Sequence, residues 1–175
     1  MDAAHFVLGV YLSFLWCFTR VSVRAPSGRQ RFNVLGALNA VTHQLITVTN
    51  DSYINSVSVG ELLEKIAGLG LTTPITLIMD NARYQRCKYV LEIADHLNIE
   101  ILFLPPYSPN LNLIERLWKF VKKDCLYGEY YEKFQLFKDA ITRCLSETSG
   151  IHKHSLKTLL TLNFQTFQPA IGDLA

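Results

Sequence analysis

Hydrophobic positions in this chain follow two kinds of spacing, and each spacing predicts one type of secondary structure. The apolar run Phe6–Phe18, broken by one glycine, predicts the end of one strand and the start of another. A third strand is predicted over Arg31–Asn39, and residues 44–49 are a candidate extension of the sheet. Ile75–Met79 is interpreted as a continuously apolar strand covered on both faces, and Ile99–Leu104 is predicted to be a second buried strand.

Four other segments carry apolar residues three and four positions apart, which is the spacing of an amphipathic helix. The first of these helices is predicted to begin with a capping box formed by Ser58 and Glu61. The four apolar stripes are Val59, Leu62, Leu63 and Ile66; Cys87, Val90, Leu91, Ala94 and Leu97; Leu113, Ile114, Leu117, Trp118 and Val121; and Phe134, Phe137, Ile141 and Leu145.

The predicted order is three strands, then helix, strand, helix, strand and two helices. A strand, a helix and a second strand within about thirty residues form a parallel crossover. The 175 residues are enough for one domain with a substantial core, so residues 1–175 are assigned to a single domain. We therefore predict an α/β fold with a mixed five-stranded sheet and helices on both faces.

The composition fits a compact cytoplasmic domain. Hydrophobic residues make up 49% of the chain and charged residues 18%, which argues against a disordered protein. The net charge of +2 means that nucleic acid would have to bind a local basic patch. The apolar run over residues 6–18 follows no Lys or Arg and is too short to cross a bilayer, so neither export nor a membrane span is predicted. The four cysteines are widely spaced along the chain: Cys17, Cys87, Cys125 and Cys144. This spacing predicts reduced thiols and argues against a zinc site or a disulfide framework.

Asp80 follows the predicted strand Ile75–Met79 and precedes Asn81, a residue type that favours helix N-caps. In open α/β sheets, functional groups collect at the carboxyl ends of strands, so Asp80 is a candidate site residue. The alternative is that Asp80 only shapes a turn, which is a common role of Asp after a strand.

Glu115 is the second candidate and lies in the first turn of the helix through Trp118. It falls beside the edge of the apolar stripe, where its carboxylate can lean toward the end of the sheet. Two structural roles compete with a functional one. Glu115 can complete a capping box with Asn112, or form an ion pair with Lys119 four residues later.

Asp2 is the third candidate. If residues 2–8 form a strand next to Ile75–Met79, Asp2 lies near Asp80, although residues this close to a chain end are often frayed and solvated. Three neighbouring carboxylates repel one another, and divalent cations relieve the repulsion. Oxygen-only ligation suits Mg²⁺ or Mn²⁺, and two such ions about 4 Å apart can activate an attacking oxygen and stabilise a leaving one.

Basic residues and histidines give weaker signals. Lys122 lies one heptad after the glutamate, on the same face of the helix, and is a candidate phosphate contact. Arg29 and Arg31 alternate on a strand and form either a phosphate-facing strip or ordinary exposed charge. His152 and His154 suggest a metal pair, but without acid or cysteine neighbours they are predicted to lie in a solvated turn.

Three segments together resemble the DDE catalytic domain of bacterial insertion-sequence transposases of the mariner-like superfamily. They are GRQRFNVLGALNA (28–40), DNARYQ (80–85) and LPPYSPNLNLIERLWKFVKK (104–123). The resemblance implies a ribonuclease H-like fold in which Asp2, Asp80 and Glu115 are the catalytic, metal-binding acids. It also implies Mg²⁺ or Mn²⁺ as cofactor, a homodimer, and cleavage of transposon ends followed by joining to target DNA, typically at TA.

Further residues are expected to contact DNA or to support the acids. The expected DNA contacts are Lys119, Lys122, Lys123, Arg29 and Arg31, and the expected supporting residues are Asn81, Tyr107, Ser108 and Asn112. Tyr107 is a candidate to stack on a base, whereas Trp118 is predicted to pack in the core.

Transposases of this kind carry an N-terminal helix-turn-helix region that reads the inverted repeats, and no such region precedes Asp2 here. Two functions therefore stay open: a metal-dependent strand-transfer domain in the bacterial cytoplasm, or an inactive remnant that only binds DNA or dimerises. A different ribonuclease H-like nuclease is a third reading, which the PYSPNLNLIE segment argues against.

Overall fold

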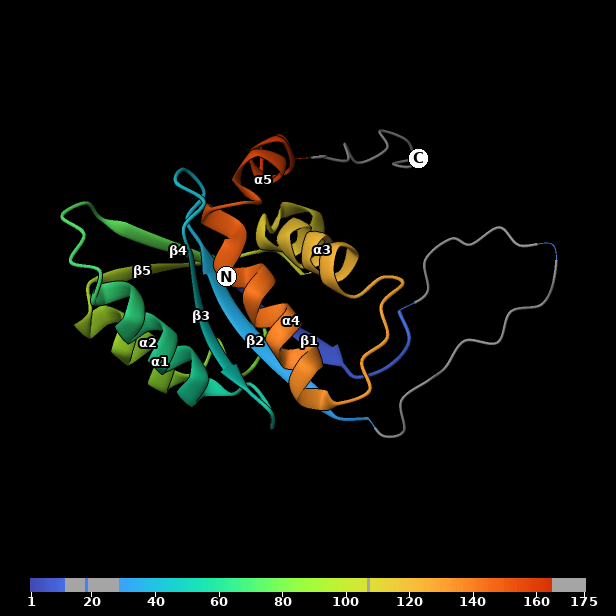
Figure 1. Cartoon of the computed structure of the whole chain (residues 1–175). Helices are drawn as coiled ribbons and strands as arrows, with labels where there is room; N and C mark the ends of the chain where they lie inside the picture. The colour runs from blue at the N-terminus through green and yellow to red at the C-terminus, as the bar shows by residue number, and fades with distance from the viewer. Residues whose placement is uncertain (12–17, 19–28, 107, 165–175) are drawn as a thin grey trace, which may run out of the picture.

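The structure is a computed structural model that describes residues 1–11, 18, 29–106 and 108–164. Three strands are followed by alternating helices and strands and then by a group of helices (Figure 1). The elements are β1 Asp2–Val7, β2 Arg31–Leu38, β3 Leu45–Asn50, α1 Ser56–Ala67, β4 Ile75–Met79, α2 Lys88–His96, β5 Ile99–Phe103, η1 Pro109–Leu111, α3 Ile114–Cys125, α4 Phe134–Ser146, η2 Glu147–Ser149 and α5 Lys153–Leu159.

The strands form two sheets, so the single five-stranded sheet predicted from the sequence is not present among the described residues. β1, β2 and β3 are antiparallel in that order, with Asp2 opposite Gly36, whereas β4 and β5 form a parallel pair. A hydrogen bond of 2.6 Å from the nitrogen of Met1 to the carbonyl oxygen of Ile78 joins the two sheets.

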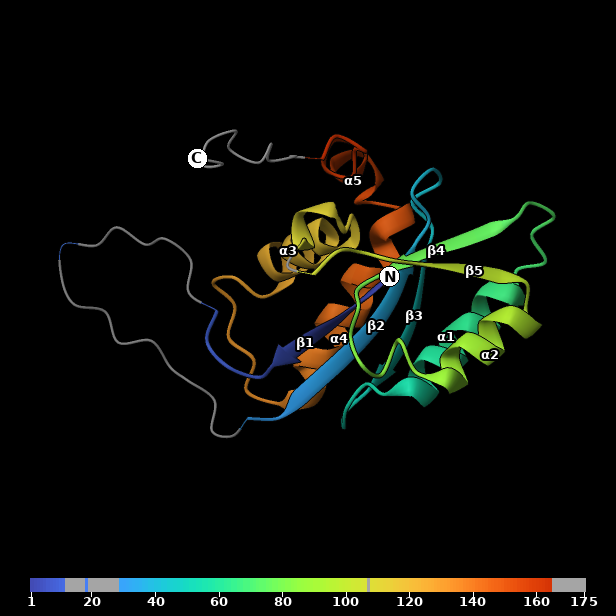
Figure 2. The same ribbon diagram turned by 180° about the vertical axis from the view of Figure 1, so that it is seen from behind.

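The two faces of the three-stranded sheet support two separate cores. Val34 in β2 belongs to a core built with α3, α4 and α5, whereas its neighbour Leu35 belongs to a core with α1, α2, β4 and β5. Successive side chains of a strand point to opposite faces, which explains the alternation. Figures 1 and 2 show the corresponding helix groups on either side of β1 and β2. The prediction of a mixed α/β fold with helices on both faces is confirmed.

The start of α1 differs from the prediction. Its capping box joins Asn55 to Ser58: the side chain of Asn55 accepts the N–H of Ser58 at 3.0 Å, and Ser58 accepts the N–H of Asn55 in return. The predicted box of Ser58 and Glu61 is therefore one turn too late. Asn55 has the extended backbone of an N-cap, whereas Ser58 is already helical.

The strands β4 and β5 are covered on one face only, contrary to the prediction. Leu77, Met79 and Ile99 are buried in the core with α1 and α2, but Ile78 is 44% exposed and Leu102 is 52% exposed. These two side chains line a largely apolar groove of about 380 Å³ on the opposite side of the pair. The apolar run shows only that the side chains are hydrophobic. In the folded protein, one face of the β4–β5 pair stays exposed.

The first sheet also departs from the prediction in its strand assignment. Its second strand is β2 and its third is β3, so the candidate extension over residues 44–49 is a complete strand. The predicted strand in the later part of Phe6–Phe18 falls on residues 12–17, which lie outside the described residues.

Two further observations concern the described part of the chain. Cys87, Cys125 and Cys144 are free thiols there. No helix in the described segments is long and apolar enough to span a membrane.

Candidate active site

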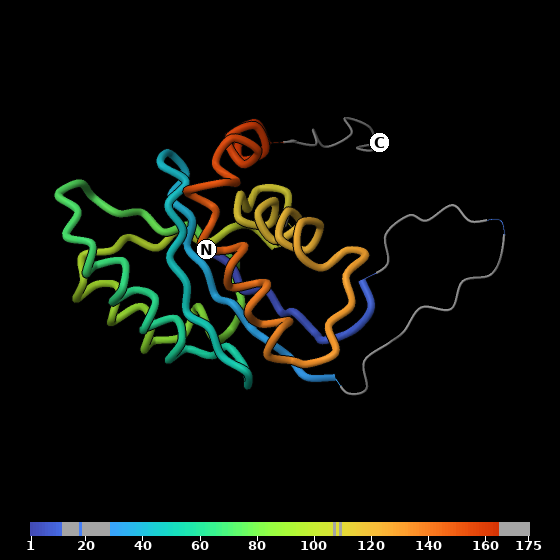
Figure 3. Tube along the Cα trace, viewed as in Figure 1, coloured from blue at the N-terminus to red at the C-terminus, as the bar shows by residue number. Residues whose placement is uncertain are grey.

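Three carboxylates from distant parts of the sequence come together where β1 begins and β4 ends. Asp80 directly follows β4, Glu115 lies in the first turn of α3, and Asp2 is the first residue of β1. The Cα trace in Figure 3 shows the first residues of the chain in the middle of the fold. A pocket of about 420 Å³ at this place is lined by Asp80, Asn81, Ala82, Leu104, Pro105, Pro106, Ser108, Asn112 and Glu115.

Asp2 is ordered and buried, with 7% of its surface exposed, so it is not the frayed terminal residue that the alternative reading expects. Burial, together with the nearby charges of Asp80 and Glu115, raises the pKa of Asp2 to about 6. Hydrogen bonds from the backbone of Ala3 and from Trp118 oppose this shift in part. Asp2 therefore lies close enough to Asp80 and Glu115 for their charges to act on it.

The indole of Trp118 holds the Asp2 carboxylate, a contact that the sequence analysis missed. Nε1 of Trp118 donates to Oδ2 of Asp2 at 3.0 Å, and the ring is buried as predicted. Gly36, opposite Asp2 on β2, makes room for this ring: a Cβ there would lie 2.8 Å from Cη2 of Trp118. An apolar stripe on a helix predicts burial of Trp118 but carries no signal for its polar partner.

Asn112 connects the loop before α3 to the acids. Its Nδ2 donates to the carbonyl oxygen of Met1 at 3.2 Å and, at a long 3.4 Å, to Oδ1 of Asp80. The capping box with Glu115 is not formed, because Leu113 occupies the N-cap position and no side chain caps α3. The side chain of Asn112 therefore contacts Asp80 and does not cap the N-terminus of α3.

Glu115 also does not form the ion pair with Lys119, which was the second alternative role predicted for it. Among the described residues, neither Asp2, Asp80 nor Glu115 forms an ion pair, and Lys119 is exposed. Glu115 is half-buried and lines the same pocket as Asp80. No described side chain therefore forms an ion pair with the three acids, although the amino group of Met1 lies close enough to interact electrostatically with Asp2 and Asp80.

Tyr84 is a second group near the acids that sequence reasoning missed. Burial raises the pKa of its hydroxyl, and the charges of Asp2 and Asp80 raise it further. The neighbouring Gln85 is fully buried and donates from Nε2 to the Tyr84 hydroxyl at 3.3 Å. Both residues belong to the turn between β4 and α2, where spacing gives no information about side-chain direction.

The other expected supporting residues have different surroundings. Asn81 is exposed at the pocket and accepts a long hydrogen bond of 3.4 Å from Arg86, so it does not cap α2, which begins at Lys88. Ser108 lines the pocket, and its hydroxyl donates to the carbonyl oxygen of Pro106 at 3.3 Å. Tyr107 lies outside the described residues.

The basic residues expected to contact DNA fall into two groups. Lys119, Lys122 and Lys123 lie on α3, the helix that carries Glu115, with Lys122 half-buried and the other two exposed. Arg31 begins β2 opposite the end of β1, about 17 Å along the strand from Asp2, and Arg29 precedes it. The lysines therefore share a helix with Glu115, about one to two turns along it, whereas the arginines lie at the other end of the three-stranded sheet.

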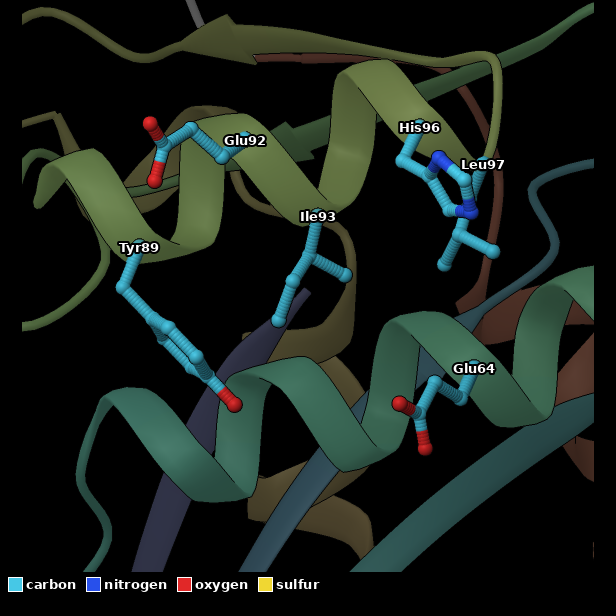
Figure 4. Close-up of a pocket in the computed structure, with 6 residues that line it drawn as sticks. All are labelled: Glu64, Tyr89, Glu92, Ile93, His96 and Leu97. Carbon is cyan, nitrogen blue, oxygen red and sulfur yellow. The ribbon is translucent and has the colours of Figure 1, made fainter.

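A second pocket of about 250 Å³ lies between α1 and α2, away from the acids (Figure 4). In Figure 4, Tyr89 and Ile93 extend from α2 toward α1. Gly60 of α1 permits this close approach, since a Cβ there would lie 3.0 Å from Cδ1 of Ile93. No residue predicted to be functional lines this pocket, so it is a gap between helices.

The acid cluster has the donor set of a site for hard divalent cations. Its ligand atoms are carboxylate oxygens from three parts of the chain. The pKa of Asp2 is raised first by burial and then by the charges of Asp80 and Glu115, and a bound cation would offset both effects. Mg²⁺ and Mn²⁺ prefer such oxygen ligands.

Comparison with known proteins agrees with this geometry. A family model described as DDE superfamily endonuclease matches residues 1–138, and the chain therefore belongs to this family. An uncharacterized protein, y4pE/y4sA of Sinorhizobium fredii (strain NBRC 101917 / NGR234), is 34% identical over 68 residues, which are 39% of this chain and 46% of that protein.

Solved structures of Mos1 transposase share the fold. The Mos1 strand transfer complex superposes with a TM-score of 0.65 at 13% identity, covering 91% of this chain and 50% of that chain. The Mos1 paired-end complex with left transposon end gives a TM-score of 0.60 at 12% identity, covering 94% of this chain and 55% of the other. The chain thus has the mixed α/β, ribonuclease H-like fold of these catalytic domains and spans about half the length of the relatives that it matches.

Proposed function

We propose that this chain is the catalytic domain of a mariner-like transposase, which cuts and joins DNA during transposition. The observation that carries the proposal is the cluster of Asp2, Asp80 and Glu115, which no described cationic side chain neutralises. Membership of the DDE superfamily endonucleases and the Mos1-like fold support the same reaction class.

In this proposal the three acids hold Mg²⁺ or Mn²⁺, as two ions. The bound metal would supply the Lewis acid that lowers the pKa of the attacking water or 3′-hydroxyl and stabilises the leaving oxygen of the phosphodiester. Asp2 is fixed by Trp118, and Asn112 links Asp80 to the first residue of the chain. These contacts orient the ligand oxygens before substrate arrives, which is the requirement for efficient phosphoryl chemistry.

DNA is the proposed substrate and partner. Lys119, Lys122 and Lys123 lie on the helix that carries Glu115 and can contact the phosphates next to the scissile bond. The names of the Mos1 complexes refer to paired ends, a transposon end and strand transfer. By analogy, recognition of transposon ends, insertion at TA and action as a homodimer are part of the proposal for the whole protein.

The reading as an inactive remnant has less support than the enzymatic one. A chain that only folds and binds DNA has no need to bury Asp2 beside two further carboxylates, where the raised pKa of Asp2 marks a cost in stability.

Cleavage assays test the proposed function. Wild-type protein should nick a supercoiled plasmid when Mg²⁺ or Mn²⁺ is present and should not nick it when a chelator removes these ions. Asp80→Asn and Glu115→Gln should each reduce the nicking rate at least about a hundredfold, because loss of a metal ligand removes stabilisation of the transition state. Glu132→Gln is the matched control, because Glu132 is an exposed carboxylate in the loop between α3 and α4.

A folded wild-type protein without nicking activity, on both plasmid DNA and a duplex of the repeats that flank its gene, would favour the remnant. Equal activity in wild type and both acid variants would instead assign the cleavage to another site or to a contaminant.

A further inference from the structure

A second group of potential metal ligands lies at the far end of α3, where three helical segments converge. Asp124 is near the C-terminal end of α3, Cys144 lies in the last turn of α4, and His152 immediately precedes α5. One ligand atom from each of these residues lies within 4.8 Å of the other two. Glu147, the first residue of η2, brings its carboxylate to within 3.4 Å of Nε2 of His152.

This cluster overturns an expectation from the sequence. His152 and His154 were predicted to lack acid or cysteine neighbours, and the cysteines to form no zinc site. For His152 the first prediction is wrong, because residues 5, 8 and 28 positions before it surround its imidazole. His154 is exposed as expected, but it lies in α5 and not in a turn.

The separations match those required for a four-coordinate transition metal. Nε2 of His152 lies 3.5 Å from Oδ2 of Asp124, and Sγ of Cys144 lies 3.6 Å from the same oxygen. With metal–sulfur bonds of about 2.3 Å and metal–nitrogen or metal–oxygen bonds of about 2.0 Å, ligand atoms in a tetrahedron are about 3.3–3.6 Å apart. The third separation, between the ligand atoms of Cys144 and His152, is within 4.8 Å, so shifts of about 1 Å or less would let the three side chains enclose an ion.

From this geometry we propose that Asp124, Cys144 and His152 bind Zn²⁺, with Glu147 or water as the fourth ligand. One sulfur, one imidazole nitrogen and one carboxylate oxygen form a mixed set that suits Zn²⁺ and not Mg²⁺. The acid cluster of Asp2 has only oxygen ligands, so the two sites select different metals.

The surroundings hold the ligands in place. The ring of Phe120 packs edge-on against the imidazole at 5.2 Å between centroids, and the backbone N–H of His152 donates to the carbonyl oxygen of Glu147 at 3.1 Å. Cys144 is 3% exposed and the side chain of His152 is 16% exposed, so the site is shielded but reachable from solvent.

An ordinary ion-pair network is the competing explanation. A protonated His152 would satisfy Asp124 and Glu147 without any metal. In that case the Cys144 thiol, whose pKa is raised by its contact with Cys125 and by burial, would stay protonated and contact Asp124 only weakly. A zinc ion uses the sulfur, the nitrogen and the oxygen together, and its binding releases the thiol proton to solvent.

The site would act as a structural clamp. Nine residues of α3, about 14 Å of helix, separate Asp124 from Glu115, so the ion is too distant to join the reaction at the acids. It would instead fasten α3 to α4 and to the segment before α5, and so stabilise the helix that presents Glu115.

Cobalt and zinc titrations of the full chain test the proposal. After treatment with a chelator, the protein should bind one Co²⁺ with the sulfur-to-metal charge-transfer band and tetrahedral d–d bands, and Zn²⁺ should displace it. In Cys144→Ser the charge-transfer band should be lost. In His152→Gln the Zn²⁺ affinity should fall by more than about a hundredfold, since loss of an outer-shell partner alone costs 10–100-fold.

Three controls separate this site from the rest of the molecule. Cys87→Ser and His154→Gln should keep the wild-type spectrum and affinity, because Cys87 lies between β4 and α2 and His154 is exposed. Asp80→Asn should also keep them, which distinguishes the zinc site from the proposed catalytic ions. His152 is near the surface, so its variant should fold, as circular dichroism can verify. Absence of the charge-transfer band in wild type, or its persistence in Cys144→Ser, would overturn the proposal.

Discussion

At the scale of single residues, the acid cluster depends on how Asp2 is held. Its carboxylate is buried, lies near two like charges and accepts a hydrogen bond from Trp118. In the absence of metal, burial and the two neighbouring negative charges make a charged Asp2 less stable in the folded state than in the unfolded chain.

Asp2→Asn is therefore expected to stabilise the metal-free protein at neutral pH. The folded pKa of about 6 is above the ordinary 3.8, so the favourable contribution of protonated Asp2 is complete below pH 3.8 and is lost as the pH rises through about 6. Asparagine stays neutral and still accepts the hydrogen bond from Trp118. In a chelator at pH 7.5, urea unfolding should show a gain of up to about 3 kcal/mol, since one pKa unit corresponds to about 1.4 kcal/mol.

At pH 4 the difference between Asp2→Asn and wild type should shrink toward zero. Asp95→Asn, an exposed position in α2, should show no such pH dependence. A stabilisation that grows on acidification would contradict the assigned direction of the pKa shift.

At the scale of elements, the helices are positioned by their ends and by the sheet face against which they pack. Glu115 and Trp118 lie about one turn apart on α3. This helix therefore supplies one carboxylate of the cluster and also the hydrogen bond that holds the carboxylate of Asp2. α1 packs in the other core and starts at the reciprocal bonds of Asn55 and Ser58.

Asn55→Ala should lower the free energy of unfolding by about 1 kcal/mol, the usual loss for a helix N-cap. Glu61→Ala should change it by less than about 0.5 kcal/mol, because the exposed ion pair of Glu61 with Lys65 contributes little. Urea unfolding of the two variants measures both values. A larger loss in the Glu61 variant would restore the capping box predicted from the sequence.

At the scale of the whole molecule, a cation at the acids would add a further link between β1, β4 and α3, which already share the two cores. A hydrogen bond at Met1 connects the three-stranded sheet to β4, Asn112 in the loop before α3 contacts Asp80, and Trp118 of α3 contacts Asp2. A ligand that binds the assembled cluster and not the unfolded chain must stabilise this arrangement.

Mg²⁺ or Mn²⁺ should consequently raise the Tm of wild-type protein. At a hundred times the Kd, the gain in the free energy of unfolding is about 2.7 kcal/mol. Asp80→Asn should remove most of the gain, whereas Cys144→Ser should keep it. An equal shift in wild type and Asp80→Asn, measured by differential scanning fluorimetry, would mean that these ions bind elsewhere.

The sequence by itself determined the elements and two of the candidate acids. Apolar spacing along the chain identified β4, α2 and α4 to within one or two residues, because the periods of strands and helices are local properties. The position of Asp80 after a buried strand and of Glu115 at the edge of an apolar stripe followed from the same local patterns.

Only the tertiary structure decided which distant residues meet. The Trp118 contact to Asp2 spans 116 positions, and the second ligand cluster joins the ends of three helical segments. The separation of the strands into two sheets and the open face of β4 and β5 likewise depend on how the layers pack. Such contacts have no period along the chain, since they are set by the packing of whole elements against one another.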